Sequence, residues 1–358
     1  MFKILTLGAL VLAALYLGAS QVSQKLSLHS KRNILVIGGA GYIGSHVCKA
    51  LKEAGFIPVV YDNMSNGHDW AVKWGPLVVG DLFDSKALDQ AFIQYQPRGV
   101  IHLASLIDVK ESMTHPDMYY KTNVEGTRQL LEAMVRNKVY QIVFSSSAAV
   151  YGNPTEVPIP ENHACEPINV YGKTKLLCEI MLADFLQNHQ IRSVSLRYFN
   201  AAGADESAEI GEAHTHETHL IPLAISAALK QKTFKLFGID HPTPDGTPIR
   251  DFVHVSDLAE AHLLALQWLL NGGSKISLNL GSGKGYSVQE VVSTIEQLIG
   301  PFPREITERN PCDPARLVAD ISLAKETLHW TPRKSDLETI ISSALKWHQK
   351  EMHETVKK

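Results

Sequence analysis

Cysteine is scarce in this chain, with four residues in 358, and no two of them form a C-x-x-C pair. The sequence therefore contains neither a cysteine-based metal motif nor a dense disulfide framework, and we expect reduced thiols in a reducing compartment. It also lacks a basic run, since 34 lysines and arginines stand against 37 acidic residues for a net charge of −3. A nucleic-acid-binding surface is not expected. The cysteines are Cys48, Cys165, Cys178 and Cys312.

The one long apolar run lies at the N-terminus, where residues 4–19 are interrupted only by Thr6 and two glycines. It is shorter than the ~20 residues that a membrane span needs. A cleaved signal peptide, an uncleaved membrane anchor and a mis-assigned start codon all remain open. Lys25, Lys31 and Arg32 follow the run, which favours a cytoplasmic protein or an anchored one whose body faces the cytoplasm. We assign residues 1–20 to this segment and 21–32 to a polar linker.

A dinucleotide-binding pattern comes next. Residues 33–37 form an apolar run, a loop with Gly38, Gly41 and Gly44 follows, and an amphipathic stretch continues to residue 55. Glycines allow a tight turn and close approach of the backbone to a pyrophosphate, which the N-terminus of the following helix attracts. Asp62 ends the next apolar run, 18 residues after Gly44. An acid there accepts hydrogen bonds from a ribose and repels a 2′-phosphate, so NAD is expected; a turn aspartate is the alternative.

Apolar runs and helical patterns alternate through the first half of the chain. Strand and helix in alternation predict an α/β fold with a Rossmann-type, doubly wound parallel sheet, in which ligands bind at the carboxyl ends of strands. From residue 197 the segments shorten and proline, glycine and histidine become frequent. We expect an NAD-binding Rossmann domain over 33–196 and a smaller mixed α/β substrate lobe, mainly 197–350. Further strands are expected near 56–61, 77–82, 99–104 and 141–144, and helices at 85–95, 117–137, 169–188, 220–230, 255–270 and 288–298.

Tyr171 and Lys175 are the candidate acid–base pair. They are four residues apart, so one face of a helix would carry both. An ammonium beside a phenol favours the phenolate, and we expect it to lower the tyrosine pKa from its usual value of ~10. Spacing of this kind is common on helix surfaces, but here it accompanies the glycine loop and the serine cluster that ends at Ser147.

Seven blocks of sequence together resemble the extended short-chain dehydrogenase/reductase family, and within it the 4-epimerases that act on nucleotide sugars. The similarity extends from residue 33 to about residue 347. The blocks are residues 38–46, 145–152, 171–175, 197–204, 217–222, 244–255 and 279–285.

The resemblance implies an enzyme that epimerises C4 of a UDP-hexose, such as UDP-glucose or UDP-galactose, with bound NAD. Tyr171 would take the O4 proton, Ser147 would hydrogen-bond O4, and Lys175 would hold the nicotinamide ribose. Hydride would leave C4, the 4-keto sugar would turn over, and hydride would return to its other face. Alternatives are 4-epimerisation of UDP-arabinose, UDP-xylose or a UDP-N-acetylhexosamine, and a non-catalytic NAD-binding regulator.

The resemblance also implies which residues bind each ligand. For Arg250 the alternative is an ion pair with a nearby aspartate, and for Asp313 it is a turn before Pro314. The implied cofactor contacts are Gly38, Gly41, Tyr42, Ile43, Gly44, Asp62, Asn63, Asp81, Leu82, Leu103, Ala104, Ser105, Thr122, Tyr171, Lys175 and Phe199. The implied substrate contacts are Ser147, Tyr171, Asn200, His219, Leu220, Phe237, Arg250 and Asp313.

Some positions differ from relatives. Sugar-nucleotide dehydratases of the family carry an acidic pair where this chain has Ala148 and Ala149, and methyl groups cannot perform acid–base chemistry. Leu103 replaces a usual phenylalanine, Lys110 a usual glycine, and Asn310 a usual arginine. We expect weaker nucleotide-sugar affinity or a different head group.

Two further expectations concern metal binding and oligomeric state. No metal is expected at His214, His216 and His219, because no cysteine or acid completes a set at finger-like spacing; the first two are interpreted as a solvated loop. Family members pair helices across a two-fold axis, which implies a homodimer.

Overall fold

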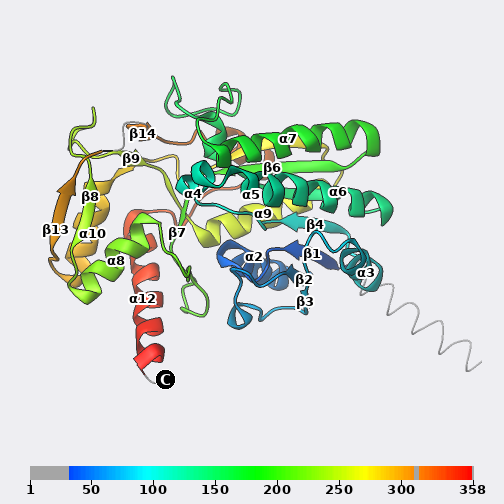
Figure 1. Ribbon diagram of the computed structural model, residues 1–358, viewed down its shortest axis with the longest axis horizontal. Coiled ribbons are helices and arrows are strands. Elements are labelled where there is room, and N and C mark those ends of the chain that lie inside the picture. Colours follow the sequence, from blue (N-terminus) through cyan, green and yellow to red (C-terminus); the bar gives the residue numbers. More distant parts are fainter. Residues whose placement is uncertain (1–31, 310–313, 357–358) are drawn as a thin grey trace, which may run out of the picture.

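The computed structural model describes residues 32–309 and 314–356, so the predictions for the N-terminal apolar segment, Asn310 and Asp313 lie outside the described residues. Its centre is a seven-stranded sheet of order β11-β6-β5-β4-β1-β2-β3 (Figure 1). Every neighbouring pair is parallel, which confirms the predicted doubly wound α/β fold. The strands are β1 (Asn33–Ile37), β2 (Ile57–Asp62), β3 (Leu77–Val79), β4 (Gly99–His102), β5 (Gln141–Ser147), β6 (Arg192–Tyr198) and β11 (Lys275–Leu280).

Helices cover both faces of the sheet because its strands are apolar on both sides. In β1, Val36 belongs to a core with Val47 of α2, whereas Leu35 belongs to a separate core with Leu130 of α6. One face is covered by α2 (Tyr42–Glu53), α9 (Val255–Leu270) and α11 (Ser322–Leu328), and the other by α3 (Ser85–Tyr95), α6 (Gly126–Arg136) and α7 (Val170–His189).

One predicted helix is interrupted. Residues 117–137 form α5 (Pro116–Tyr119), a π-helical turn η2 (Tyr120–Glu125) and α6, rather than one helix. The side chain of Asn123, in the π turn, bonds to Leu106 and to Thr174 of α7. Wide turns of this kind are frequent at functional sites. A short helix, α4 (Val109–Thr114), precedes α5.

The smaller lobe packs around α8 (Leu220–Lys230), α10 (Val288–Ile299) and α12 (Leu337–Val356), beside the parallel pair β8 (Phe234–Phe237) and β13 (Arg304–Thr307) (Figure 1). The chain returns from this lobe to the main sheet through α9 and β11. The exact division of the chain into two domains stays a prediction. Shorter strands are β7 (Asn200–Ala202), β9 (Ile249–Arg250), β10 (Phe252–His254), β12 (Tyr286–Ser287) and β14 (Arg316–Leu317).

Among residues 32–309 and 314–356, no helix has both the length and the apolar character that crossing a bilayer requires.

Candidate active site

The carboxyl end of β5 and the start of α7 bring three candidate residues together. Ser147 ends β5, and its hydroxyl accepts a hydrogen bond from the backbone N–H of Ala149 at 3.1 Å. Asn169 caps α7 by accepting the N–H of Gly172 at 2.7 Å, which fixes the first turn of the helix, where Tyr171 lies. One turn later, the Nζ of Lys175 lies 5.7 Å from the centroid of the Tyr171 ring. Spacing of four residues on a helix thus gives the predicted proximity.

The prediction that Lys175 lowers the pKa of Tyr171 is wrong. Burial raises the pKa of Tyr171 above its usual value, and a hydrogen bond with Ser147 acts in the opposite direction. The lysine is itself buried, and burial lowers its pKa to about 8. The ammonium donates a hydrogen bond to the backbone oxygen of Ser145 at 2.8 Å rather than to the phenol. The spacing in the sequence predicts that the two residues are close, but it does not predict burial. Here burial decides the sign of the pKa shift of Tyr171.

The glycine loop has the shape a dinucleotide needs. Gly38 has φ +80°, and a Cβ on it would lie 2.6 Å from the backbone nitrogen of Ala104. A Cβ on Gly41, in contrast, would meet only the Gly38 oxygen at 3.5 Å, so space lies open above the loop. Neither a side-chain cap nor an acidic residue occupies the first turn of α2. Its N–H groups and helix dipole therefore suit a pyrophosphate, and the residues present fit NAD.

Acidic residues lie at the carboxyl ends of β2 and β3. Asp62 ends β2, and its two carboxylate oxygens accept the N–H groups of Ala40 at 3.0 Å and Met64 at 2.9 Å. The carboxylate thus holds the glycine loop, while its remaining lone pairs are able to accept hydroxyl groups of a ribose. Asp81 follows β3 and accepts a hydrogen bond from Asn63 at 2.8 Å. The structure therefore groups these three predicted residues at one edge of the sheet.

Asn123 is a residue of this region that sequence reasoning missed. It is 2% exposed, and its amide accepts the N–H of Leu106 at 2.8 Å and donates to Thr174 at 3.1 Å. It thereby joins the loop after β4 to α7, next to Lys175. A polar residue within an apolar helical stripe was the available signal. This loop contains the predicted residues Leu103, Ala104 and Ser105, and Thr122 precedes Asn123 in η2.

Four other predicted cofactor residues lie in the first turn of α2 and after β3 and β6. The Tyr42 hydroxyl, at the start of α2, donates to the backbone oxygen of Gly203 at 2.6 Å. Phe199 directly follows β6 and is 9% exposed. Leu82 follows Asp81 and packs beside Gly126 of α6, and Ile43 lies in the first turn of α2.

Predicted substrate residues come from several elements of the smaller lobe. Asn200 in β7 donates its side-chain amide to the backbone oxygen of Asp251 at 2.9 Å, which places it beside Arg250 of β9. Phe237 ends β8 and is 56% exposed, and the Nζ of Lys110 in α4 lies 6.0 Å from its ring centroid. The atypical lysine therefore faces a predicted substrate residue of the other lobe.

The segment before α8 differs most from expectation. His219 precedes Leu220 at the start of α8, and its Nδ1 lies 2.5 Å from Glu212 and 3.3 Å from Glu217. His214 pairs with the same two carboxylates, at 3.2 and 3.5 Å, so the solvated-loop interpretation is wrong for His214. These bonds raise the pKa of His214, and they raise that of His219 although burial opposes the shift. His216, in contrast, is exposed.

Comparisons with known proteins agree with this geometry. A UDP-glucose 4-epimerase of Rhizobium meliloti (strain 1021) is 49% identical over 320 residues, covering 89% of this chain and 97% of that protein. The crystal structure of UDP-glucose 4-epimerase from Brucella ovis in complex with NAD has a TM-score of 0.86 and 47% identity, covering 88% of this chain and 98% of that one.

A further solved structure contains a nucleotide sugar. It is a UDP-glucose-4-epimerase from Stenotrophomonas maltophila with bound NAD and formylated UDP-arabinopyranose, with a TM-score of 0.87 and 37% identity, covering 90% of this chain and 99% of that one. The model of the NAD dependent epimerase/dehydratase family matches residues 34–281. The resemblance seen in the sequence is thereby confirmed, and the chain belongs to the NAD dependent epimerase/dehydratase family.

Proposed function

We propose that this protein is an enzyme that interconverts UDP-glucose and UDP-galactose by NAD-dependent epimerisation at C4. The observation that carries the proposal is the grouping of Ser147, Tyr171 and Lys175 at the same carboxyl edge of the parallel sheet as the glycine loop. The similarity to UDP-glucose 4-epimerases over almost 90% of the chain supports the same activity.

The three side chains divide the proton chemistry between them. Tyr171 is the proposed base that takes the O4 proton and later returns it. Ser147 hydrogen-bonds the phenol and favours its ionisation, and it is the proposed hydrogen-bond partner of O4. Lys175 supplies positive charge within one helical turn and is the proposed partner of the nicotinamide ribose. The cofactor, when bound, would supply the hydride acceptor and donor.

The smaller lobe provides the proposed contacts to the nucleotide sugar. Arg250 suits a diphosphate because a guanidinium is planar and permanently charged. Asn200 lies beside it, and Phe237 and Leu220 present apolar surface from two further elements. His219 is the proposed sugar-facing residue at the start of α8.

A second candidate substrate is a UDP-pentose. One similar structure, at 37% identity, was solved with formylated UDP-arabinopyranose. The same three catalytic side chains would serve a pentose, because they act at C4 and do not depend on C6. A panel of UDP-glucose, UDP-xylose and UDP-N-acetylglucosamine separates the candidates by kcat/KM.

The decisive experiment uses purified protein with NAD and UDP-glucose. We expect UDP-galactose to form and Tyr171→Phe to lower turnover by about 10²–10⁴-fold, because the variant lacks the hydroxyl that exchanges the proton. Tyr140→Phe is the matched control, since Tyr140 is 37% exposed at the opposite end of β5, and it should keep full turnover. No product from any sugar of the panel, with NAD bound, would favour the non-catalytic regulator instead.

Assembly and location belong to the same proposal. A homodimer is supported by exposed apolar side chains on adjacent helices: Met113, Met118, Leu177 and Ile180 are 57%, 39%, 41% and 51% exposed. Light scattering should give twice the chain mass, and Ile180→Glu should reduce the measured mass to that of a monomer.

The proposed location is the cytoplasm, with the protein either free or anchored through residues 4–19. Fractionation of cells that express the protein with and without those residues tests the anchor.

A further inference from the structure

Two histidines and two glutamates converge in the segment that leads from β7 to α8. Glu212, His214, Glu217 and His219 each direct one ligand-type atom into a single space, and these atoms all lie within 4.8 Å of one another. Each histidine presents Nδ1, and each Nδ1 faces both carboxylates. The cluster lies outside the Ser147–Tyr171–Lys175 group and has no part in the proton chemistry described above.

The backbone holds these side chains in place from both sides. The buried Glu212 has its backbone oxygen bound by the Trp347 indole of α12 at 2.8 Å. On the far side of the turn, Oε1 of Glu217 accepts the N–H groups of Thr218 and His219, both at 2.8 Å. The Glu217 carboxylate and the backbone of Glu212 are therefore held in place before any ligand arrives.

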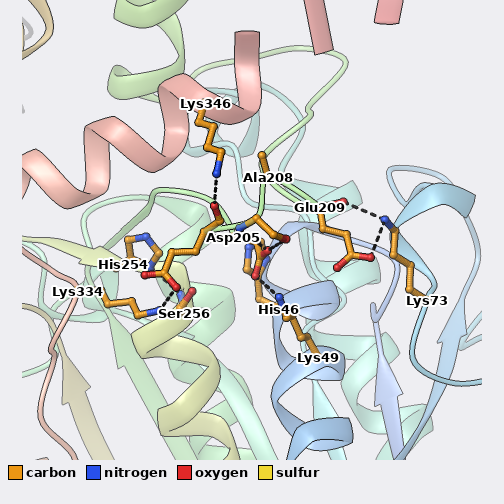
Figure 2. A network of polar contacts seen from close by, with 12 residues as sticks. His46, Lys49, Lys73, Asp205, Ala208, Glu209, His254, Ser256, Lys334 and Lys346 are labelled. Atoms are coloured by element: carbon orange, nitrogen blue, oxygen red, sulfur yellow. Dashed lines mark hydrogen bonds and ion pairs between the residues drawn. The ribbon is translucent and has the colours of Figure 1, made fainter. Parts of the chain in front are cut away.

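Lysines from α2, α12 and the loop before β3 hold the stretch immediately before the cluster. Figure 2 shows Lys49, Lys73 and Lys346 pointing toward residues 205–209 from different directions. Lys49 of α2 pairs with Asp205, Lys73 pairs with Glu209, and Lys346 of α12 donates to the backbone oxygen of Glu206. The segment that presents the cluster is thus attached to both lobes.

We propose that Glu212, His214, Glu217 and His219 form a binding site for a divalent transition-metal cation of the zinc type. A tetrahedral site with bonds of about 2.1 Å has ligand–ligand edges of about 3.4 Å. The distances from His214 Nδ1 to Glu212 Oε1 and Glu217 Oε2, 3.2 and 3.5 Å, match such an edge. His219 Nδ1 lies 3.3 Å from the other Glu217 oxygen, Oε1. The fourth distance, 2.5 Å between His219 and Glu212, has to lengthen by about 1 Å, which a side-chain rotation of the half-exposed imidazole allows.

The chemistry of the ligands selects the class of cation. Two imidazole nitrogens favour zinc, nickel or copper over magnesium and calcium, which prefer oxygen. Two carboxylates balance the charge of a divalent cation. The competing state is the metal-free cluster, in which two protonated histidines pair with the same carboxylates.

Such a cation would fix the entry to α8. It would cross-link Glu212 and His214 to Glu217 and His219 across the turn at residues 215–216, directly before Leu220. The proposed role of the cation is therefore structural. His219 is also the proposed sugar-facing residue, but the binding claim does not depend on which reaction the protein catalyses.

The test is a zinc titration of the full-length protein, free of any polyhistidine tag and treated with a chelator. We expect saturable calorimetric binding of one zinc ion per chain and a rise in Tm, both insensitive to excess magnesium. His214→Ala and Glu212→Gln should each weaken zinc binding about tenfold or more. His216→Ala is the matched control, because His216 is exposed and lies outside the cluster, and it should leave zinc affinity unchanged.

Two outcomes would overturn the proposal. One is the absence of saturable zinc binding to a folded protein, which leaves the paired metal-free cluster as the resting state. The other is equal weakening by His216→Ala and His214→Ala, which indicates chelation by surface histidines. If buried Glu212→Gln does not fold by circular dichroism, His214→Ala carries the comparison, since the His214 side chain is 23% exposed. Binding and Tm are read without substrate, so failure here is distinct from failure of the proposed epimerisation.

Discussion

Lys175 carries a charge where the protein gives it little solvation. Its side chain is 2% exposed, and its Nζ donates to a backbone oxygen and lies 5.2 Å from the centroid of the Phe144 ring. Burial lowers its pKa from 10.5 to about 8. A difference of that size corresponds to about 3 kcal/mol against the ammonium in the folded state. A cost of this order at one residue is typical of a site kept for function rather than for stability.

Lys175→Met should therefore stabilise the cofactor-free protein at pH 7 while it removes epimerase activity. The gain is at most about 3 kcal/mol, less about 1 kcal/mol for the lost hydrogen bond to Ser145. Between pH 8 and 10.5 the unfolded wild type binds more protons than the folded wild type, so the free energy of unfolding of the wild type rises with pH. The difference in stability between the wild type and the variant therefore becomes smaller. Urea denaturation at pH 7 and pH 9.5 measures both effects. Exposed Lys173→Met, on the same helix, is the control, and a less stable Lys175→Met at pH 7 would contradict the argument.

Ser147 controls how readily Tyr171 ionises. Its hydrogen bond lowers the pKa of the phenol against the opposing effect of burial, so Ser147→Ala should raise that pKa. Because the base must be deprotonated, the acidic limb of the kcat/KM profile should move to higher pH in this variant. Ser147→Thr keeps the hydroxyl and should leave the limb where it is. If the acidic limb of the kcat/KM profile stays at the same pH in Ser147→Ala, a group other than Tyr171 determines that limb.

Among the elements, the glycine loop between β1 and α2 depends on backbone shape more than on any side chain. Gly38→Ala should abolish NAD binding, because its Cβ would lie 2.6 Å from the backbone nitrogen of Ala104, where no flexible side chain can move away. Gly272→Ala is a matched control: Gly272 also has a positive φ, +104°, yet a Cβ there meets nothing within 4 Å. Both variants bear backbone strain of roughly 1–2 kcal/mol, but only the first should lose NAD in a calorimetric titration. Equal NAD affinity in the two variants would count against the steric explanation.

At the scale of the whole molecule, the sequence predicts what local patterns determine. Buried parallel strands appear as apolar runs that end in glycine, aspartate or serine, so the main sheet and the glycine loop were predictable. The bounds of α3, α8 and α9 equal those expected. What could not be predicted depends on contacts between distant segments. Asn123 interrupts a helix to reach α7, and burial reverses the pKa shift of Tyr171.

The histidine–glutamate cluster was also not predictable from local sequence patterns. Its four members lie within eight residues, but a loop that doubles back brings them together, and a search for finger-like spacing passes over them. Trp347, His68 and the lysines around residues 205–209 hold that loop from both lobes.

The attachment of residues 205–209 to both lobes predicts how the molecule responds to loss of one lysine. The Asp205 side chain is 8% exposed, and although burial opposes it, hydrogen bonds from Lys49 and Ser207 lower its pKa to about 2. Lys49→Met leaves this carboxylate without its cation and should cost about 1–3 kcal/mol in the free energy of unfolding at pH 7. Lys73→Met breaks a more exposed pair, 32% and 44% exposed, and should cost less than about 1 kcal/mol. The depressed pKa of Asp205 also predicts a pH dependence. Its carboxylate contributes to the free energy of unfolding above pH 3.8, and that contribution is lost as the pH falls toward 2. The Lys49→Met variant should therefore begin acid unfolding at a higher pH than wild type, and equal acid transitions in the two proteins would mean that this ion pair does not hold the lobes together.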